Sequence, residues 1–198
     1  MNTTLKYYNT NAKAFITNTQ DADMSTAQNK FLNRLKKGAS ILDFGCGSGR
    51  DTKYFIQKGY EVTATDGSDA LCQMASEYTG IKVKKMFFNE LSDIGIYDGI
   101  WACASILHLP KSELKPVIMK MSNALKDRGV IYTSFKYGSF EGERGGRYYT
   151  NFTETDFGAF IADVPTLTVE ECWITGDVRE GRNAERWLNL ILRKWDIR

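Results

Sequence analysis

The sequence is poor in the residues that build metal sites and membrane spans. Its 198 residues include one histidine and four cysteines, and the cysteines, at positions 46, 72, 103 and 172, never lie close together. A zinc framework needs paired ligands a few residues apart, so this spacing excludes one. The longest apolar runs, such as residues 100–104, are only as long as a strand. They fall far below the roughly 18 residues that suggest a membrane-spanning helix.

A strong excess of one charge is also missing. Lysine and arginine total 26 against 24 aspartates and glutamates, which leaves a net charge of +2. Proteins that follow a phosphate backbone carry a strongly basic surface, so a nucleic-acid partner is disfavoured. Residues 1–11 are polar and lack the apolar stretch and the cleavage site of a signal peptide. We therefore expect a cytoplasmic protein with reduced cysteines and no membrane association.

What is present is typical of one soluble domain. Hydrophobic residues make up 42% of the chain and charged residues 25%, and 198 residues is the usual size of a single domain. Apolar residues recur at helical spacing over residues 4–17 and 26–36, with Ser25 as the N-cap and Gly38 as the stop of the second helix. These two helices are expected to form an N-terminal cap, residues 1–37.

Strands and helices then alternate along the chain. Apolar, strand-sized runs occur at residues 39–44, 60–65, 81–87, 97–103 and 130–135. Helical patterns separate them at residues 50–58, 68–78 and 112–125, the last capped by Ser112. Strand, helix and strand repeated in this order predict a parallel sheet with right-handed crossovers and helices on both faces.

The last third of the chain has a different pattern. Residues 153–162 look helical, and residues 166–175 and 187–193 look like two strands. The connection between these strands is polar and too short for a crossover helix, so the pair is expected to form a hairpin. That hairpin places one antiparallel strand in a mostly parallel sheet. No repeat or linker divides residues 38–198, which are therefore predicted to form the core of the same single domain.

Three glycines follow the first predicted strand and open the next helix. Gly45, Gly47 and Gly49 are spaced Gly-x-Gly-x-Gly, whereas a dinucleotide fingerprint needs a glycine where Arg50 stands. Such a loop lets the backbone approach a ligand and leaves exposed N–H groups, although a tight turn alone is the structural alternative. Asp43 lies two residues ahead of the first glycine, where it would repel a pyrophosphate and favour a cation. A nucleoside with a sulfonium and an ammonium group fits this loop better than one that carries phosphates.

A second acid follows the second predicted strand. Asp66 comes 17 residues after Gly49, close to the position where nucleoside-binding sheets place the carboxylate that takes the ribose hydroxyls. The alternative is that Asp66 caps the next helix, but Ser68 and Asp69 already provide caps. We therefore assign Asp66 to the ribose.

These motifs resemble those of class I S-adenosylmethionine-dependent methyltransferases. The resemblance is carried by ILDFGCGSGR at residues 41–50, TDGS at residues 65–68, YDGIWACASILH at residues 97–108 and LKDRGV at residues 125–130. The sequence is especially similar to small bacterial methyltransferase-domain proteins of the tellurite-resistance-like group. The resemblance implies an α/β, Rossmann-like three-layer sandwich with a seven-stranded, mostly parallel sheet and an antiparallel C-terminal strand.

The resemblance also implies a set of contacts to S-adenosylmethionine and, after transfer, S-adenosylhomocysteine. The methionine part would contact the glycine loop and the end of the fourth strand. The ribose would contact Asp66, and the adenine would lie near Gly67 and Asn89. Asn89 stands where the family usually has an acid, and Tyr8 of the first helix would close over the site. The full set of cofactor residues is Tyr8, Asp43, Gly45, Cys46, Gly47, Gly49, Asp66, Gly67, Ser68, Asn89, Glu90, Ala102 and Cys103.

The implied reaction is an in-line displacement of the methyl group from a cationic sulfur. Such a reaction needs positioning more than activation, and a general base only where the acceptor loses a proton. His108 follows the fourth predicted strand and is the candidate catalytic base. The alternative is that His108 fixes the loop before Pro110.

The acceptor is expected to be a small molecule held by segments that differ between family members. The loop 136–149 combines glycines, aromatics and cations and is a candidate lid. Its Tyr137, Arg147 and Tyr148, together with Arg179 of the hairpin connection, are the candidate acceptor-binding residues. Trp173 and Trp187 are candidate walls, with a place in the core as the alternative.

Other functions remain open at this point. A transfer-RNA methyltransferase is disfavoured by the near-neutral charge and by residues 102–105, which replace the Asn/Asp-Pro-Pro-Tyr signature of many base amino-methylases. The glycine spacing disfavours a nicotinamide-dependent dehydrogenase. A non-catalytic relative that binds S-adenosylmethionine stays possible, and the chain is expected to act as a monomer or homodimer.

Overall fold

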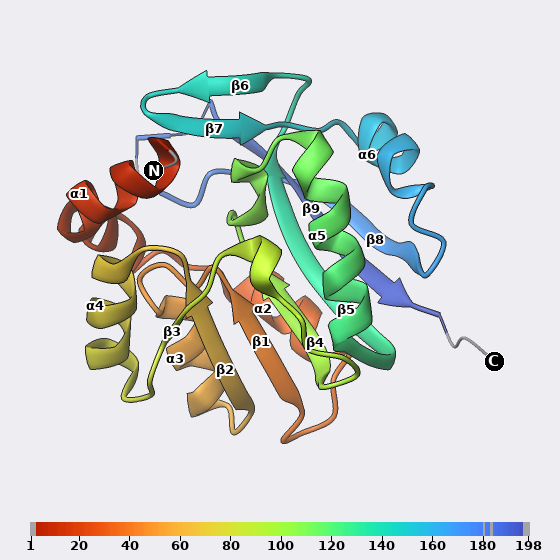
Figure 1. The fold of residues 1–198 in the computed structure, drawn as a ribbon, viewed down its shortest axis with the longest axis horizontal. Coiled ribbons are helices and arrows are strands. Elements are labelled where there is room, and N and C mark those ends of the chain that lie inside the picture. Colours follow the sequence, from red (N-terminus) through yellow and green to blue (C-terminus); the bar gives the residue numbers. More distant parts are fainter. Residues whose placement is uncertain (1–2, 180, 183, 196–198) are drawn as a thin grey trace.

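A seven-stranded sheet runs through the molecule with helices on both of its faces (Figure 1). The computed structural model describes residues 3–179, 181–182 and 184–195. The strands lie in the order β3-β2-β1-β4-β5-β9-β8. Their bounds are β1 (Ser40–Phe44), β2 (Glu61–Asp66), β3 (Lys84–Lys85), β4 (Tyr97–Ala102), β5 (Leu125–Lys136), β8 (Leu167–Gly176) and β9 (Arg186–Lys194). This order confirms the predicted α/β, Rossmann-like sandwich.

The antiparallel strand also stands where it was predicted. The pairs among β1 to β5 are parallel, whereas β9 pairs antiparallel with both β5 and β8. Strand β8 therefore points the same way as the parallel strands, and β9 alone is reversed. The short connection between β8 and β9 is the cause, because it leaves no room for a crossover.

Two apolar layers hold the helices to the sheet. Successive residues of a strand face opposite sides, so Ile41 packs on one face of β1 and Leu42 on the other. The face with Ile41 meets α2 (Ser25–Leu32) and α3 (Arg50–Gln57) through Phe31 and Phe55. The face with Leu42 meets α5 (Lys111–Ala124) and α6 (Glu154–Ile161), and Figure 1 shows α5 on the near side of the sheet with α2 and α3 behind it.

Four sequence predictions of local structure need correction. Helix α2 ends at Leu32 rather than at residue 36, because the chain tightens there into i→i+3 hydrogen bonds. Met24, not Ser25, is its N-cap residue. The strand over residues 81–87 shrinks to β3, which pairs with β2 on one side only. Helix α5 starts after Pro110, whose carbonyl accepts from the backbone N–H groups of residues 113 and 114, so Ser112 is not its cap.

The segment predicted as a loop over residues 136–149 contains a second, small sheet. Strands β6 (Glu141–Arg144) and β7 (Arg147–Thr150) pair antiparallel. Gly145 and Gly146 join them with φ values of +56° and +75°. Positive φ at both central residues is the requirement of a two-residue hairpin turn, which Gly-Gly meets without strain. The Gly-Gly pair was the sequence signal for this ribbon.

The remaining helices complete the cap and the edge of the sheet. Helix α1 (Thr3–Thr19) lies beside β7 and α4 (Asp69–Thr79), and short 3₁₀ turns follow β3 and β4 at Phe88–Glu90 and Ile106–His108 (Figure 1). Within the described part of the chain, no helix is long and apolar enough to cross a membrane.

Candidate active site

A cavity of about 770 Å³ opens at the carboxyl ends of the parallel strands. Ligands of open α/β sheets bind in this position, and the volume is typical of small-molecule sites. Its walls come from α1, from the loops after β1, β2, β4 and β5, and from the connection between β8 and β9. Twelve predicted site residues line it: Tyr8, Asp43, Gly45, Cys46, Gly47, Asp66, Gly67, Asn89, Cys103, His108, Arg147 and Arg179.

The glycine loop between β1 and α3 needs its glycines for backbone reasons. Gly45 has a φ of +85°, and a Cβ atom there would lie 2.6 Å from the Cβ of Ser105. Gly49 has a φ of +78°, and a Cβ atom there would lie 2.7 Å from the Cγ2 of Thr79. A side chain at either position would combine an unfavourable backbone with a clash. The loop therefore brings β1, α3 and α4 together at the cavity wall.

The amide groups of this loop are already used inside the protein. The N–H groups of Gly45 and Cys46 both donate to the carbonyl of Thr65 at 2.9 Å, and that of Gly47 donates to the Asp66 carboxylate at 2.9 Å. The sequence-based expectation of exposed N–H groups is therefore wrong for these three residues. Since they cannot cradle a phosphate without losing these bonds, the loop suits a ligand that is not anionic there.

Asp66 holds the loop and faces the cavity. Its Oδ2 accepts from Gly47 N–H, and its Oδ1 accepts from the N–H of Ser68 at 2.9 Å. Burial raises its pKa, while these backbone donors oppose the rise. Ser68, which accepts from Leu71 N–H, is the N-cap of α4. The alternative reading of Asp66 as the helix cap is therefore wrong.

A buried pair of acids lies at the other end of the glycine loop. Burial raises the pKa of Asp43 to about 8, and the neighbouring Asp51 adds to the rise. Thr52 donates its hydroxyl to Asp43 at 2.5 Å. Burial would also raise the pKa of Asp51, but Arg50 at 2.8 Å, Trp101 and other donors hold it below its usual range. Asp51 is thus the ionised member, and Asp43 holds a proton that a cationic ligand could displace.

A hydrogen-bond chain fixes α1 over this part of the cavity. The Tyr8 hydroxyl lies 2.8 Å from His108 Nε2, and His108 Nδ1 lies 2.6 Å from the Tyr148 carbonyl. A carbonyl only accepts, so Nδ1 carries the proton, and Nε2 accepts from Tyr8. Thr4 accepts from the N–H of Tyr148 at 2.9 Å, and Asn9 accepts from the Ser68 hydroxyl at 2.7 Å. Helix α1 is therefore bound to both β7 and the start of α4.

Burial explains the pKa values of the two side chains in this hydrogen-bond chain, His108 and Tyr8. Burial lowers the pKa of His108 to about 4, so its imidazole is neutral near neutral pH. Burial raises the pKa of Tyr8 to about 12, although the nearby Arg147 opposes the rise. The role of His108 as a base stays a prediction. A proton leaving the acceptor reaches Nε2 only by way of Tyr8 or after Tyr8 moves away.

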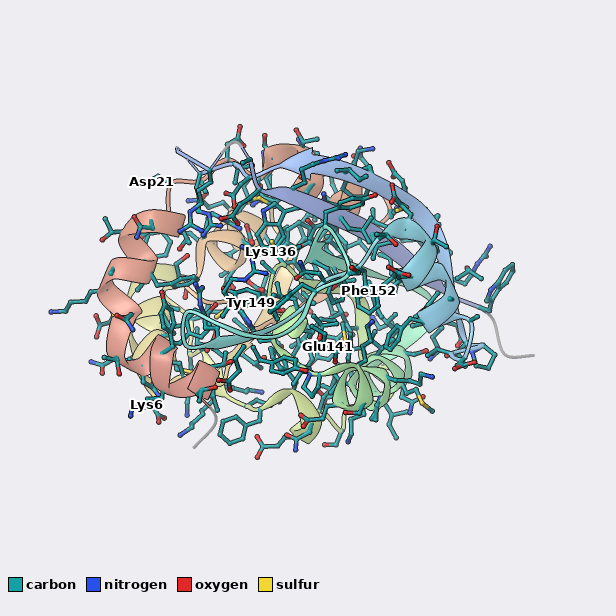
Figure 2. The ribbon with its side chains drawn as sticks, turned by 90° about the horizontal axis from the view of Figure 1, so that it is seen from above. Lys6, Asp21, Lys136, Glu141, Tyr149 and Phe152 are labelled. Atoms are coloured by element: carbon teal, nitrogen blue, oxygen red, sulfur yellow. The ribbon has the colours of Figure 1, made fainter. Side chains whose placement is uncertain are left out.

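A further part of the cavity wall is aromatic and cationic. Lys136 lies with its Nζ 5.2 Å from the ring centroid of Tyr149, and Figure 2 shows these two side chains next to each other. Arg179 pairs with Asp177 through its Nε at 2.8 Å. Burial would raise the pKa of Asp177, but Arg179 and the indole N–H of Trp187 lower it to about 2. Trp187, for which both a cavity wall and a place in the core were considered, lines the cavity and also packs against the core, with its indole N–H bonded to Asp177.

Six predicted site residues do not line the cavity. Gly49 packs against α4, Ser68 caps that helix, and Glu90 folds back to accept from the N–H of Phe87. Ala102 is enclosed in the core, and the other two residues, Tyr137 and Tyr148, direct their side chains toward Arg186 and Glu141. Any contact from these six is indirect, as in the carbonyl of Tyr148 that holds His108.

Several lining residues were missed. Leu5, Asn9 and Phe15 of α1, Phe88 after β3, and Asp177 all reach the cavity. The apolar stripe over residues 4–17 was the available signal for α1, because a helix that caps a sheet edge turns that stripe toward whatever lies beneath it. The spacing of residues along the sequence gave no indication that Asp177 lines the cavity.

Known proteins with a similar sequence are methyltransferases. Residues 41–129 match the family model of a methyltransferase domain. An uncharacterized methyltransferase from Staphylococcus carnosus (strain TM300) is 27% identical over 186 residues, which cover 88% of this chain and 89% of the relative.

Two solved structures share the fold. The 1,6-didemethyltoxoflavin-N1-methyltransferase of Burkholderia thailandensis, with bound 1,6-didemethyltoxoflavin and S-adenosylhomocysteine, is 22% identical with a TM-score of 0.76. That similarity covers 96% of this chain and 85% of the other. The magnesium protoporphyrin IX methyltransferase of Synechocystis PCC 6803, with bound SAH, is 16% identical with a TM-score of 0.73, covering 96% and 97% of the two chains.

The sheet order, the position of the cavity and the matched domain define a class of protein, the class I S-adenosylmethionine-dependent methyltransferases. Residues 41–129 of this chain match a methyltransferase domain, and the whole chain has the fold of these enzymes.

Proposed function

We propose that the enzyme transfers the methyl group of S-adenosylmethionine to a small-molecule acceptor by in-line displacement. The observation that carries the proposal is one cavity that is lined by two unlike sets of residues. One set is the glycine loop with Asp66, and the other includes Arg147 and Trp187. A donor and an acceptor bound side by side in one cavity can be aligned for direct transfer.

The residues present fit the cofactor. Asp66 uses its two oxygens for backbone N–H groups and keeps further lone pairs for the ribose hydroxyls. Asp43 and the glycine loop would take the ammonium group and the methionine chain, because the loop offers acids and few free amides. Gly67 and Asn89 would border the adenine.

Positioning supplies most of the proposed rate enhancement. When bound, S-adenosylmethionine supplies a methyl group on a cationic sulfur. Helix α1 and the aromatic side chains would exclude water and fix the acceptor, and such alignment can contribute about 7–11 kcal/mol. His108 is proposed as the proton acceptor for substrates that lose a proton, with Tyr8 between it and the cavity.

A small acceptor is favoured over a nucleic acid. The cavity is lined by aromatic side chains and by cations that are mostly paired with acids, such as Arg179 with Asp177. The Burkholderia neighbour holds 1,6-didemethyltoxoflavin together with S-adenosylhomocysteine, so this fold can accommodate a small molecule with the cofactor product. We further propose that the enzyme is a cytoplasmic, single-domain monomer or homodimer.

Calorimetry with S-adenosylmethionine, S-adenosylhomocysteine and NAD tests the cofactor. We expect both sulfur compounds to bind and NAD not to bind. Binding of NAD alone would overturn the proposal. A methyl-transfer screen of thiols, amines, carboxylates and oxyanions such as tellurite then tests the acceptor. Transfer to nucleic acid alone would favour a transfer-RNA methyltransferase, and tight cofactor binding without any transfer would favour a non-catalytic relative.

A further inference from the structure

Arg147 differs from the other cations around the acceptor side of the cavity. Lys136 pairs with Glu185 at 2.5 Å, and Arg179 pairs with Asp177. Among the described residues, no carboxylate lies within ion-pair distance of Arg147. The positive charge of Arg147 on the cavity wall therefore has no acid among the described residues to neutralise it.

The surroundings of Arg147 make this charge costly to leave alone. Its guanidinium carbon lies 4.3 Å from the ring centroid of Tyr7, 5.3 Å from that of Tyr149 and 5.9 Å from that of Tyr8. Its Nε atom is buried, and no described residue accepts a hydrogen bond from it. Tyrosine rings hold a guanidinium by cation–π contact but do not replace an anion.

We propose that the acceptor is a planar aromatic molecule with a carboxylate or similar anionic group, and that Arg147 binds that group. This inference rests on the proposed methyl transfer. A guanidinium presents paired N–H groups in the geometry that a carboxylate accepts, so a guanidinium on a cavity wall without a described carboxylate partner selects such a group.

The neighbours of Arg147 explain why the rest of the acceptor is aromatic. Tyr149 and Trp187 line the cavity on the same side, and Asp177 holds the Trp187 indole in place at 3.0 Å. Fixed rings bind flat ligands at low entropic cost. Arg147 also lies 5.9 Å from the ring centroid of Tyr8, and both residues line the same cavity as Asp66. An acceptor anchored on Arg147 is thus placed next to the nucleoside side of the cavity.

The test compares aromatic acids with their neutral amides. The full-length protein is first loaded with S-adenosylhomocysteine, and then benzoate, 2-naphthoate and indole-3-carboxylate are titrated in parallel with the corresponding amides. We expect at least one acid to bind about tenfold or more tightly than its amide, the size of a charge-assisted hydrogen bond. Arg147→Gln should remove this preference, and Arg147→Lys should keep part of it.

Arg144→Gln is the matched control. Arg144 pairs with Arg147 in the β6–β7 ribbon, but it is exposed and does not line the cavity, so the same charge change there should leave the preference intact. The inference is overturned if no acid binds better than its amide, if Arg147→Gln keeps the preference, or if that variant weakens cofactor binding instead. A failure of S-adenosylhomocysteine to bind at all would overturn the proposed function itself.

Discussion

Asp43 should make the binding of S-adenosylmethionine depend on pH. Burial, with a contribution from Asp51, raises the pKa of Asp43 from 3.8 to about 8 in the cofactor-free protein. A carboxylate that faces a sulfonium and an ammonium group must be ionised to stabilise them. Binding therefore has to remove the proton from Asp43, and the affinity should rise with pH until the pKa is passed.

The size of the effect follows from that pKa. At pH 7 a group with a pKa of about 8 is roughly nine-tenths protonated, so cofactor binding should release about 0.9 proton from Asp43. Below pH 8 the affinity should fall by up to about tenfold for each pH unit, or about 1.4 kcal/mol. The effect of pH on folding stability has the opposite sign. The folded protein keeps this proton between pH 4 and 8 and the unfolded chain does not, so Asp43 lowers the free energy of unfolding as pH rises.

Calorimetry at pH 6, 7 and 8, in two buffers of different ionisation enthalpy, measures both the affinity and the protons released. Asp43→Asn is the control, because it removes the carboxyl group while leaving any protons taken up by the ligand's own amine, whose pKa is also about 8. If the wild type and Asp43→Asn release the same number of protons at pH 7, Asp43 does not interact with the cationic part of the cofactor.

Three further predictions concern single residues. Asp66→Ala should weaken S-adenosylmethionine binding by about 1–3 kcal/mol, because two ribose hydroxyls lose their acceptor, and unchanged calorimetric affinity would show that Asp66 has another role. His108→Ala should slow turnover by about 10²–10⁴-fold with an acceptor that loses a proton; full turnover in a steady-state assay would exclude it as the base. Gly49→Ala should lose more stability in urea unfolding, by about 1–3 kcal/mol, than Gly80→Ala. Both glycines have positive φ, but only Gly49 also has a neighbour, Thr79, in the way, so equal losses would contradict the clash.

Much of the fold was predictable because it follows from local periodicity and chain length. Apolar runs of strand length located β1, β2, β4 and β5 to within a few residues, except that β5 begins earlier than expected. The short polar connection after β8 was enough to predict that β9 runs antiparallel. The prediction failed for β3, because an edge strand paired on one side needs no continuous apolar run.

The site was predictable where its residues follow a strand directly. Asp43 and Asp66 end neighbouring parallel strands, so their sequence positions alone place both at the same edge of the sheet. The bond between Tyr8 and His108 joins residues 100 positions apart, and the pairing of Asp177 with Trp187 depends on the hairpin geometry. Periodicity carries no information on such contacts. The hydrogen bonds from the loop N–H groups to the Thr65 carbonyl could not be predicted for the same reason.

The way α1 is attached has a consequence for the apparent affinity of the enzyme. Only Thr4 and Ala12 of this 17-residue helix are buried, so a few polar contacts to His108, to β7 and to the N-cap of α4 help to hold a wall of the cavity. A helix held in this way undocks at a small fraction of the free energy of global unfolding. The dissociation constant measured for any ligand that touches α1 is the intrinsic constant divided by the fraction of molecules with α1 docked. Hydrogen exchange of the α1 amides should therefore slow when cofactor is added, and the extent of slowing measures how far binding and docking are coupled.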